Sequence, residues 1–305
     1  MDFNNLATCM GTLFLLMATG FLCNKAGLLK PEANKMLSRL IINVAMSAMI
    51  VDSIVNTDIN LSPSAAAELA GSVAAYYGVL FLLSLLFSRT IARNRPDSGV
   101  YQFMVLFGNI GFLGFPLISS LFGEGALFYA AIYNIPFNVL VYTYGVVLIS
   151  GKRDADSLKK TLHSAPVISA VAALTLLVLG VRLPAFLSDA VGSLGAMTVP
   201  GAMLVVGSSL ANLPGRELLR EWRVYVLAAF TLLLRPVAVW AVLRLFLQDP
   251  LILGVSVVLS AVPAAANTTV LCIEYNSNEG LASFAVFITT IVSMLTMPLV
   301  AILLL

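Results

Sequence analysis

The sequence predicts an all-α integral membrane protein with ten transmembrane helices, arranged as two inverted repeats of five helices each. Three observations lead to this class. Hydrophobic residues make up 60% of the 305 residues and charged residues only 10%, whereas soluble domains carry about 25% charged residues. The apolar residues form ten runs that approach the roughly 20 residues a membrane-spanning helix requires. The basic residues gather in alternate connections between these runs.

The ten expected spans follow one another with short polar connections. We place them at Leu6–Leu22, Met36–Val55, Ala65–Phe87, Val100–Leu121, Ala126–Ile149, His163–Gly180, Ala190–Ala211, Val224–Leu247, Leu251–Ile273 and Leu281–Leu304. A polar linker, residues 151–162, separates a first repeat at 1–150 from a second repeat at 163–305. Because each half has an odd number of spans, the halves enter the membrane in opposite directions, as in the inverted repeats of many carriers.

The distribution of charge predicts which side of the membrane each connection faces. Fourteen of the 17 basic residues lie in every second connection: Lys25, Lys30, Lys35, Arg39, Arg89, Arg93, Arg95, Lys152, Arg153, Lys159, Lys160, Arg216, Arg220 and Arg223. The opposite connections contain mainly acidic residues. The positive-inside rule places the basic connections in the cytoplasm and both termini outside it. We therefore expect a multi-pass protein of the plasma (inner) membrane.

The composition leaves little material for other classes of function. A net charge of +2 does not indicate a nucleic-acid partner. The three cysteines, Cys9, Cys23 and Cys272, show no CxxC spacing, and the single histidine, His163, lies beside a charged loop. Motifs of hydrolases and metalloproteases, such as GxSxG and HExxH, are missing from the sequence. An intramembrane enzyme is therefore a distant alternative, and we expect neither catalytic residues nor metal ligands.

Two of the expected spans contain stretches that weaken a helix. Residues 108–116 read Gly-Asn-Ile-Gly-Phe-Leu-Gly-Phe-Pro, and residues 261–269 read Ala-Val-Pro-Ala-Ala-Ala-Asn-Thr-Thr. Proline removes a backbone donor and glycine favours non-helical angles. Within hydrocarbon, the freed backbone groups are tolerated only against other protein or around a water-filled cavity. Two interrupted spans in corresponding places of two halves indicate the binding site of a secondary transporter.

Four segments carry a resemblance to a known family. They are Gly20-Phe-Leu-Cys-Asn-Lys-Ala-Gly-Leu-Leu, the glycine-rich stretch 108–116, Thr143-Tyr-Gly, and residues 263–276, which end in Glu-Tyr-Asn. In these segments the chain resembles the auxin efflux carrier family, whose bacterial members include transporters of malonate and other organic acids. The short linker at 151–162, where many plant carriers have a long cytoplasmic loop, favours the bacterial type.

The resemblance implies a ten-helix fold similar to that of the bile-acid/sodium symporters and the sodium–proton carriers. Spans 1, 2, 6 and 7 would form a scaffold, and spans 3–5 and 8–10 a transport domain that moves in an elevator-type alternating-access mechanism. The broken spans 4 and 9 would cross at Pro116 and Pro263, with Gly108 and Gly114 as further hinge positions. The implied substrate is a small organic anion, either malonate-like, another carboxylate or an auxin-like acid, and a homodimer is a candidate assembly. The alternative is a sodium- or proton-coupled symporter or antiporter for another solute.

Candidate substrate-binding residues lie at the two breaks. Asn109 matches the family position associated with substrate contact, and its amide can hold a carboxylate without a buried charge. The alternative is an amide that satisfies a free carbonyl group of the broken helix. Asn267, Thr268 and Thr269 could bind substrate or a sodium ion, or could instead join neighbouring helices. The remaining candidates at the breaks are Gly111, Pro116 and Pro263.

Two further candidates lie in other spans. Arg235 is far from both ends of its span, and an intramembrane cation is a functional hypothesis by default. Its partner would be an anionic substrate or, alternatively, backbone carbonyl groups freed by Pro236. Asn138 lies one turn from Asn134, so both could line the same cavity. No carboxylate is expected near mid-membrane, which argues against sodium–proton antiport. A sodium ion stays a candidate partner, and no other cofactor is expected.

Overall fold

The computed structural model describes residues 3–55, 63–151, 165–181, 183–212 and 220–304. Within these ranges the chain is helical, and the one β-type pairing is an isolated bridge. The described part contains six helical segments that are long and apolar enough to cross a membrane: Pro31–Asp52, Ala66–Thr90, Leu127–Ser150, Ala185–Ala211, Trp222–Leu243 and Glu279–Leu304. The predicted all-helical membrane class is therefore confirmed. Residues 152–162 of the predicted linker, and His163, lie outside the described residues.

The first half of the chain contains helices that are interrupted by π-helical turns. Its elements are α1 (Phe3–Lys25), α2 (Pro31–Leu40), η1 (Ile41–Met46), α3 (Ser47–Val55), α4 (Pro63–Thr90), α5 (Ser98–Leu106), η2 (Ile110–Gly114), α6 (Phe115–Phe122), η3 (Glu124–Ala126), α7 (Leu127–Leu140), η4 (Val141–Gly145) and α8 (Val146–Ser150). Among these, η1, η2 and η4 are π-helical, and η3 is a short 3-10 turn. Single π-helical turns inside α-helices are frequent at functional sites.

The second half shows the same kind of interruption. Its elements are α10 (Ala165–Val178), α11 (Ala185–Ala196), α12 (Thr198–Ala211), α14 (Trp222–Ala229), η5 (Phe230–Leu234), α15 (Arg235–Leu243), α16 (Pro250–Ala261), α17 (Asn267–Glu274) and α18 (Glu279–Leu304). The π-helical turn η5 joins α14 to α15 within one apolar segment. The short helices α16 and α17 are separated by the five residues 262–266.

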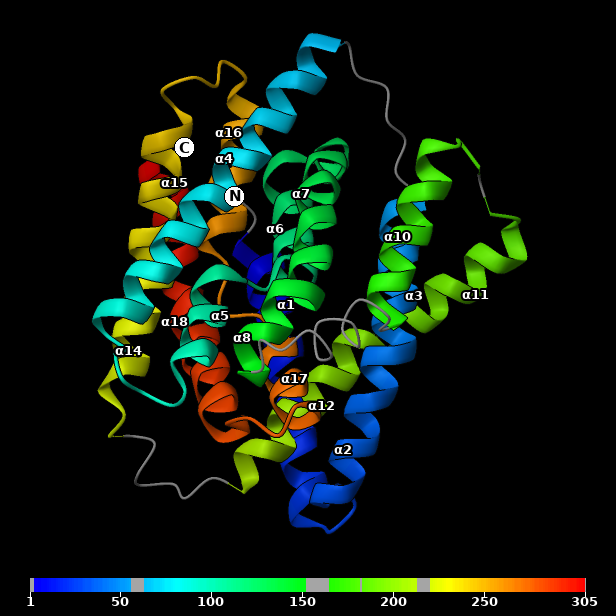
Figure 1. Ribbon diagram of the computed structural model, residues 1–305, viewed down its shortest axis with the longest axis vertical. Helices are drawn as coiled ribbons and strands as arrows, with labels where there is room; N and C mark the ends of the chain where they lie inside the picture. The colour runs from blue at the N-terminus through cyan, green and yellow to red at the C-terminus, as the bar shows by residue number, and fades with distance from the viewer. Residues whose placement is uncertain (1–2, 56–62, 152–164, 182, 213–219, 305) are drawn as a thin grey trace.

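The helices pack into two groups. In the first group, α1 packs along α12, and α3 packs against α10 and α11. In the second group, α4 packs against α5 and α15, α15 against α16, and α17 against α18. Figure 1 shows α2, α3, α10 and α11 on one side of the molecule and α4, α14, α15 and α18 on the other. The groups meet where α12 contacts α18 and where α2 contacts α17.

The pairing of α1 with α12 depends on two glycines. A Cβ atom at Gly207 would overlap the carbonyl group of Met17, and one at Gly20 would overlap that of Leu204. Small residues allow transmembrane helices to approach until their backbones touch. The two helices therefore form a closely packed pair within the first group.

Two helices are broken, and their breaks cross. Helix α5 ends at Leu106, and Phe107 has extended backbone angles (φ −112°, ψ 110°). Gly108 forms an antiparallel bridge with Ala264, which lies in the break between α16 and α17. In this bridge, the Asn109 N–H donates to the Pro263 carbonyl at 2.8 Å. The Ala265 N–H donates to the Phe107 carbonyl at 3.2 Å. Backbone groups that the breaks release from helical bonding are thus satisfied by the opposite break.

The position of the first break corrects one expectation. The sequence placed the crossing at Pro116 and Pro263, with Gly108 as a further hinge position, whereas the two breaks pair at Gly108 and Ala264, next to Pro263 and away from Pro116. Pro116 is the second residue of α6, and α6 directly follows the π-helical turn η2. Pro236 has the same place in α15, after the π-helical turn η5. A π-helical turn shifts the hydrogen-bond register, so a residue without an N–H follows it without ending the helix.

Candidate functional site

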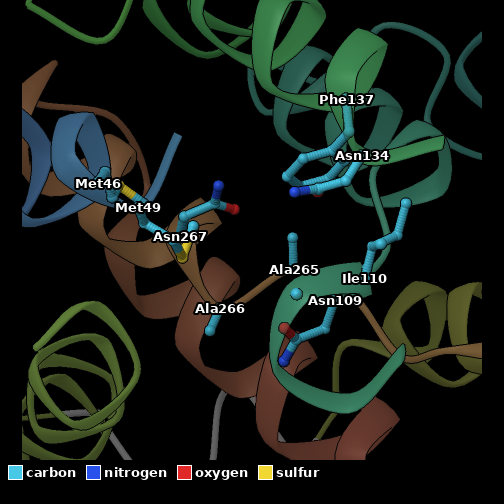
Figure 2. A pocket seen from close by; sticks show the side chains of 10 residues that line it. Met46, Met49, Asn109, Ile110, Asn134, Phe137, Ala265, Ala266 and Asn267 are labelled. Atoms are coloured by element: carbon cyan, nitrogen blue, oxygen red, sulfur yellow. The ribbon is translucent and has the colours of Figure 1, made fainter. Parts of the chain in front are cut away.

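A small cavity lies against the crossing of the two broken helices. It is lined by residues from η1, α3, α7, the η2 break and the α17 break: Met46, Met49, Asn109, Ile110, Gly111, Asn134, Phe137, Ala265, Ala266 and Asn267 (Figure 2). Its position follows from the backbone, because the bridge between Gly108 and Ala264 brings the start of η2 beside the start of α17. The crossing therefore places residues from both halves of the chain around one space.

Three asparagines supply the polar part of this cavity. Asn109, Asn134 and Asn267 are 4%, 2% and 5% exposed. In Figure 2 the amide groups of Asn134 and Asn267 point toward each other across the cavity. The Oδ1 atom of Asn267 is buried without a hydrogen-bond partner among the described residues. A buried polar atom without a partner costs about 1–3 kcal/mol, so this oxygen is available for a ligand or a water molecule.

The two helix starts contribute partial positive charge to the cavity without a charged side chain. Asn109 directly precedes the helical segment formed by η2 and α6, and Ala266 directly precedes α17. The N-terminus of a helix carries a partial positive charge and free N–H groups, which favour an anion. None of the ten lining residues is acidic or basic. The cavity thus suits a negatively charged group that is held by amides and helix dipoles.

The remaining wall of the cavity is apolar. Met46 and Met49 approach from η1 and α3, and Phe137 approaches from α7 (Figure 2). The free volume is about 20 Å³, and a single water molecule requires about 10–15 Å³. In this conformation the cavity can accept a water-sized group, so an organic acid requires it to widen. The flexible thioether side chains of the two methionines are suited to such a change.

The other predicted residues around the second break make contacts within the protein. The Thr268 hydroxyl donates to the Ala265 carbonyl at 2.6 Å, and Thr269 accepts a hydrogen bond from Ser283 of α18 at 3.3 Å. Neither threonine lines the cavity. Pro263 contributes its carbonyl group to the crossing. The Thr269 contact joins α17 to α18, as in the alternative in which these residues join neighbouring helices, whereas Thr268 bonds within its own segment.

Three predicted residues in the first half also lie outside the cavity. Gly114 faces α16, because a Cβ atom there would lie 2.8 Å from Cδ2 of Leu259. Pro116 lies in α6 beyond the π-helical turn. Asn138 is one turn past Asn134, is 1% exposed, and has an Nδ2 atom without a partner among the described residues. The structure therefore brings Asn109, Gly111 and Asn267 together and leaves Asn138 one turn away.

Arg235 lies at the crossing but does not line the cavity. Its guanidinium donates hydrogen bonds to the carbonyl groups of Val105, Ser260 and Val262. These carbonyls belong to the ends of α5 and α16 and to the following break. The expected alternative of backbone partners thus matches the observed contacts, but the two helix breaks supply the carbonyls, whereas Pro236 was expected to free them.

Several lining residues carry no signal in the sequence. Met46, Met49, Ile110 and Phe137 are apolar residues within apolar spans, so nothing distinguishes them from lipid-facing or core positions. Ala265 and Ala266 follow Pro263, and their role comes from the backbone crossing. The place of Met46, Met49 and Phe137 in the site follows only from the packing of η1, α3 and α7 around the break.

Comparison with known proteins identifies the class. The family model described as "Membrane transport protein" matches residues 7–160 and 155–301. The chain therefore belongs to this family, which is the auxin efflux carrier family that the sequence resembles. It is a multi-pass membrane protein, and the family indicates a transporter rather than an enzyme.

Two archaeal proteins resemble the chain over nearly its full length. The "Uncharacterized transporter MJ1031" of Methanocaldococcus jannaschii is 27% identical over 295 residues, which cover 93% of this chain and 94% of the relative. An "Uncharacterized transporter" of Methanothermobacter thermautotrophicus is 25% identical over 299 residues, which cover 94% and 95%. Both names describe transporters, and the alignments span both broken helices.

Proposed function

We propose that the protein is a secondary transporter that carries a small organic anion, such as a malonate-like acid, another carboxylate or an auxin-like acid. The main support is the cavity at the crossing, where neutral amides and two helix N-termini surround one space. Amide groups and helix dipoles bind a carboxylate without the desolvation penalty of a buried cation. The apolar wall of Met46, Met49 and Phe137 suits the carbon skeleton of such an acid.

We further propose that the chain forms two inverted five-helix repeats, 1–150 and 163–305, joined by the linker 151–162. Two reciprocal contacts support this arrangement. Glu68 of α4 accepts hydrogen bonds from the backbone N–H groups of Gln248 (2.9 Å) and Asp249 (3.3 Å), between α15 and α16. Glu221, directly before α14, pairs with Arg95, between α4 and α5, at 3.4 Å. Glu68 and Glu221 lie at the start of the expected third span of their own half. Each contacts the connection that follows the third span of the other half, so the two contacts correspond under a twofold relation between the halves.

The two packing groups support an elevator-type movement. Met46 and Met49 belong to the group of α1–α3 and α10–α12, which would be the scaffold. Asn267 is the first residue of α17 in the other group, and Asn109 lies in the break that pairs with that group; this group would be the transport domain. Arg39 of α2 joins Glu274 at the end of α17 by an ion pair of 2.9 Å across the boundary. Movement of one group past the other would carry the amides along the methionine wall and would break this ion pair.

The distribution of basic residues gives a testable orientation. We expect both termini to face the outside of the plasma membrane, because the connections rich in lysine and arginine remain on the cytoplasmic side. Reporter fusions at the C-terminus and within the linker 151–162 measure this directly. The linker fusion should be active in the cytoplasm and the C-terminal fusion outside. A cytoplasmic C-terminus would contradict the inverted-repeat arrangement.

Transport itself is tested with purified protein in lipid vesicles. We expect uptake of labelled carboxylates from a panel that includes a dicarboxylate, a short monocarboxylate and an aromatic acid such as indole-3-acetate. Protein-free vesicles give the background, and amino acids and inorganic cations serve as negative substrates. Each carboxylate is measured in sodium and in choline buffers, so that coupling to sodium appears as a difference. Movement of amino acids or cations with no carboxylate would refute the proposal.

A further inference from the structure

Arg235 carries a positive charge that no carboxylate of the described residues neutralises by an ion pair. It is the first residue of α15, within the apolar segment Trp222–Leu243, and it is fully buried. An isolated buried cation is strongly unfavourable in a membrane interior, so its surroundings must compensate the charge.

The compensation comes from both broken helices at once. Nε donates to the Ser260 carbonyl at 2.6 Å, Nη2 donates to the Val262 carbonyl, and Nη1 donates to the Val105 carbonyl at 3.0 Å. Ser260 is the penultimate residue of α16, and Val105 is the penultimate residue of α5. The last carbonyl groups of a helix have no partner within the helix. One guanidinium therefore satisfies carbonyls of two helix ends that lie side by side.

The charges at this point balance. The C-terminus of a helix carries the equivalent of about half a negative charge. Two such ends face Arg235, so together they offset about one positive charge. The planar guanidinium presents five N–H donors in a fixed arrangement and stays protonated, which suits it for several acceptors in different directions. A side chain without N–H donors would leave these buried carbonyl groups without their present partner.

We propose that the guanidinium of Arg235 is a covalently attached cation that holds the two broken helices together at their crossing. Without it, the carbonyl oxygens around it would form a site for a free cation. The carbonyl oxygens of Val105, Ser260 and Val262 form the acceptors of that site. Arg235 acts as a positioning residue, because it fixes the crossing from which Asn109 and Asn267 face the cavity. This inference goes beyond the proposed function, since it concerns the stability of the crossing and does not depend on the substrate.

The test is chemical replacement of the missing group. Arg235→Ala removes the guanidinium and leaves the carbonyl oxygens facing a vacant space. We expect its Tm in detergent to fall by on the order of 10 °C. Low millimolar guanidinium chloride should recover part of this loss, measured against choline chloride at equal ionic strength. Sodium chloride is the second probe, because carbonyl oxygens are ligands for hard cations.

The control variants separate charge from volume. Arg235→Met fills a similar volume without charge, so it should be destabilised and should not respond to guanidinium. Arg235→Lys keeps the charge with fewer donors, so it should fold with a smaller loss of Tm. Arg244→Ala, at an exposed residue directly after the same apolar segment and beside Trp240, should match the wild type. If Arg235→Ala yields no folded protein, the comparison of Arg235→Lys with Arg235→Met decides the question.

Three results would overturn the inference. Equal Tm values for Arg235→Met and the wild type would show that the charge is not required. Equal responses of Arg235→Ala and the wild type to guanidinium would show that no vacant cation position was created. A Tm of Arg235→Lys as low as that of Arg235→Met would show that charge at this point does not hold the crossing. A recovery of Tm by guanidinium in Arg235→Ala alone would support the inference, whatever substrate the protein carries.

Discussion

Replacing Asn109 or Asn267 with alanine should lower the affinity for an organic-anion substrate about tenfold or more while the protein stays folded and inserted. Both amides line the cavity at the crossing, and each lies at the start of a half-helix. Losing a hydrogen bond to a charged group costs about 1.5–3 kcal/mol, and each 1.4 kcal/mol corresponds to about a tenfold change in affinity. The Oδ1 atom of Asn267 is buried without a described partner, so its removal breaks no hydrogen bond of that oxygen, and the loss of stability is confined to the contact of the side chain with Tyr142.

The measurement is substrate binding to purified variants, with uptake into vesicles as a second readout. Asn43→Ala is a matched control, because Asn43 is an exposed amide of η1 that bonds to the Arg39 carbonyl of its own helix. It should bind like the wild type. If Asn267 holds a sodium ion, its variant should first change the sodium dependence of binding. Normal binding by both cavity variants would place the substrate elsewhere and reduce these asparagines to structural caps.

The existence of the two breaks could be predicted from the sequence because the signal is local. Glycine and proline change the backbone at their own positions, and an asparagine within an apolar run is unfavourable unless its amide finds a partner or a ligand. The predicted position of the crossing in the first broken helix was wrong for a physical reason. Pro116 was expected to mark the break, but the π-helical turn before it accommodates the missing N–H. The crossing lies at Gly108, where the lack of a side chain allows the two broken segments to approach each other.

The partners of Arg235 and the apolar wall of the cavity could not be predicted. The sequence left two alternatives for Arg235, and it contains no indication that the ends of α5 and α16 converge on one side chain. Met46, Met49 and Phe137 look like any other apolar residues of a span, and only the packing of α3 and α7 around the break reveals them. Contacts between distant segments decide these roles, whereas composition and periodicity describe single segments.

Two glycines in the first break should respond to alanine in opposite ways. A Cβ atom at Gly108 would lie 2.6 Å from Cγ2 of Val262 and 3.1 Å from Nη2 of Arg235. One at Gly111 would have no neighbour within 4 Å, and Gly111 lines the cavity. Gly108→Ala should therefore destabilise the protein by about 1–3 kcal/mol. Gly111→Ala should keep or raise stability, since glycine within a helix is less favourable than alanine by about 0.5–1 kcal/mol, and it should weaken substrate binding.

The source of the Gly108 effect is tested by a double-mutant cycle with Val262→Ala. That substitution removes the methyl group that the new Cβ atom would meet, so the loss in the double variant should be smaller than the sum of the two single losses. Thermal unfolding gives the stabilities, and binding of a carboxylate found by the uptake panel gives the affinities. Additive losses would show that the contact with Val262 does not limit the crossing. A Gly108→Ala variant as stable as the wild type would contradict the close approach itself, because the added methyl group would overlap Cγ2 of Val262.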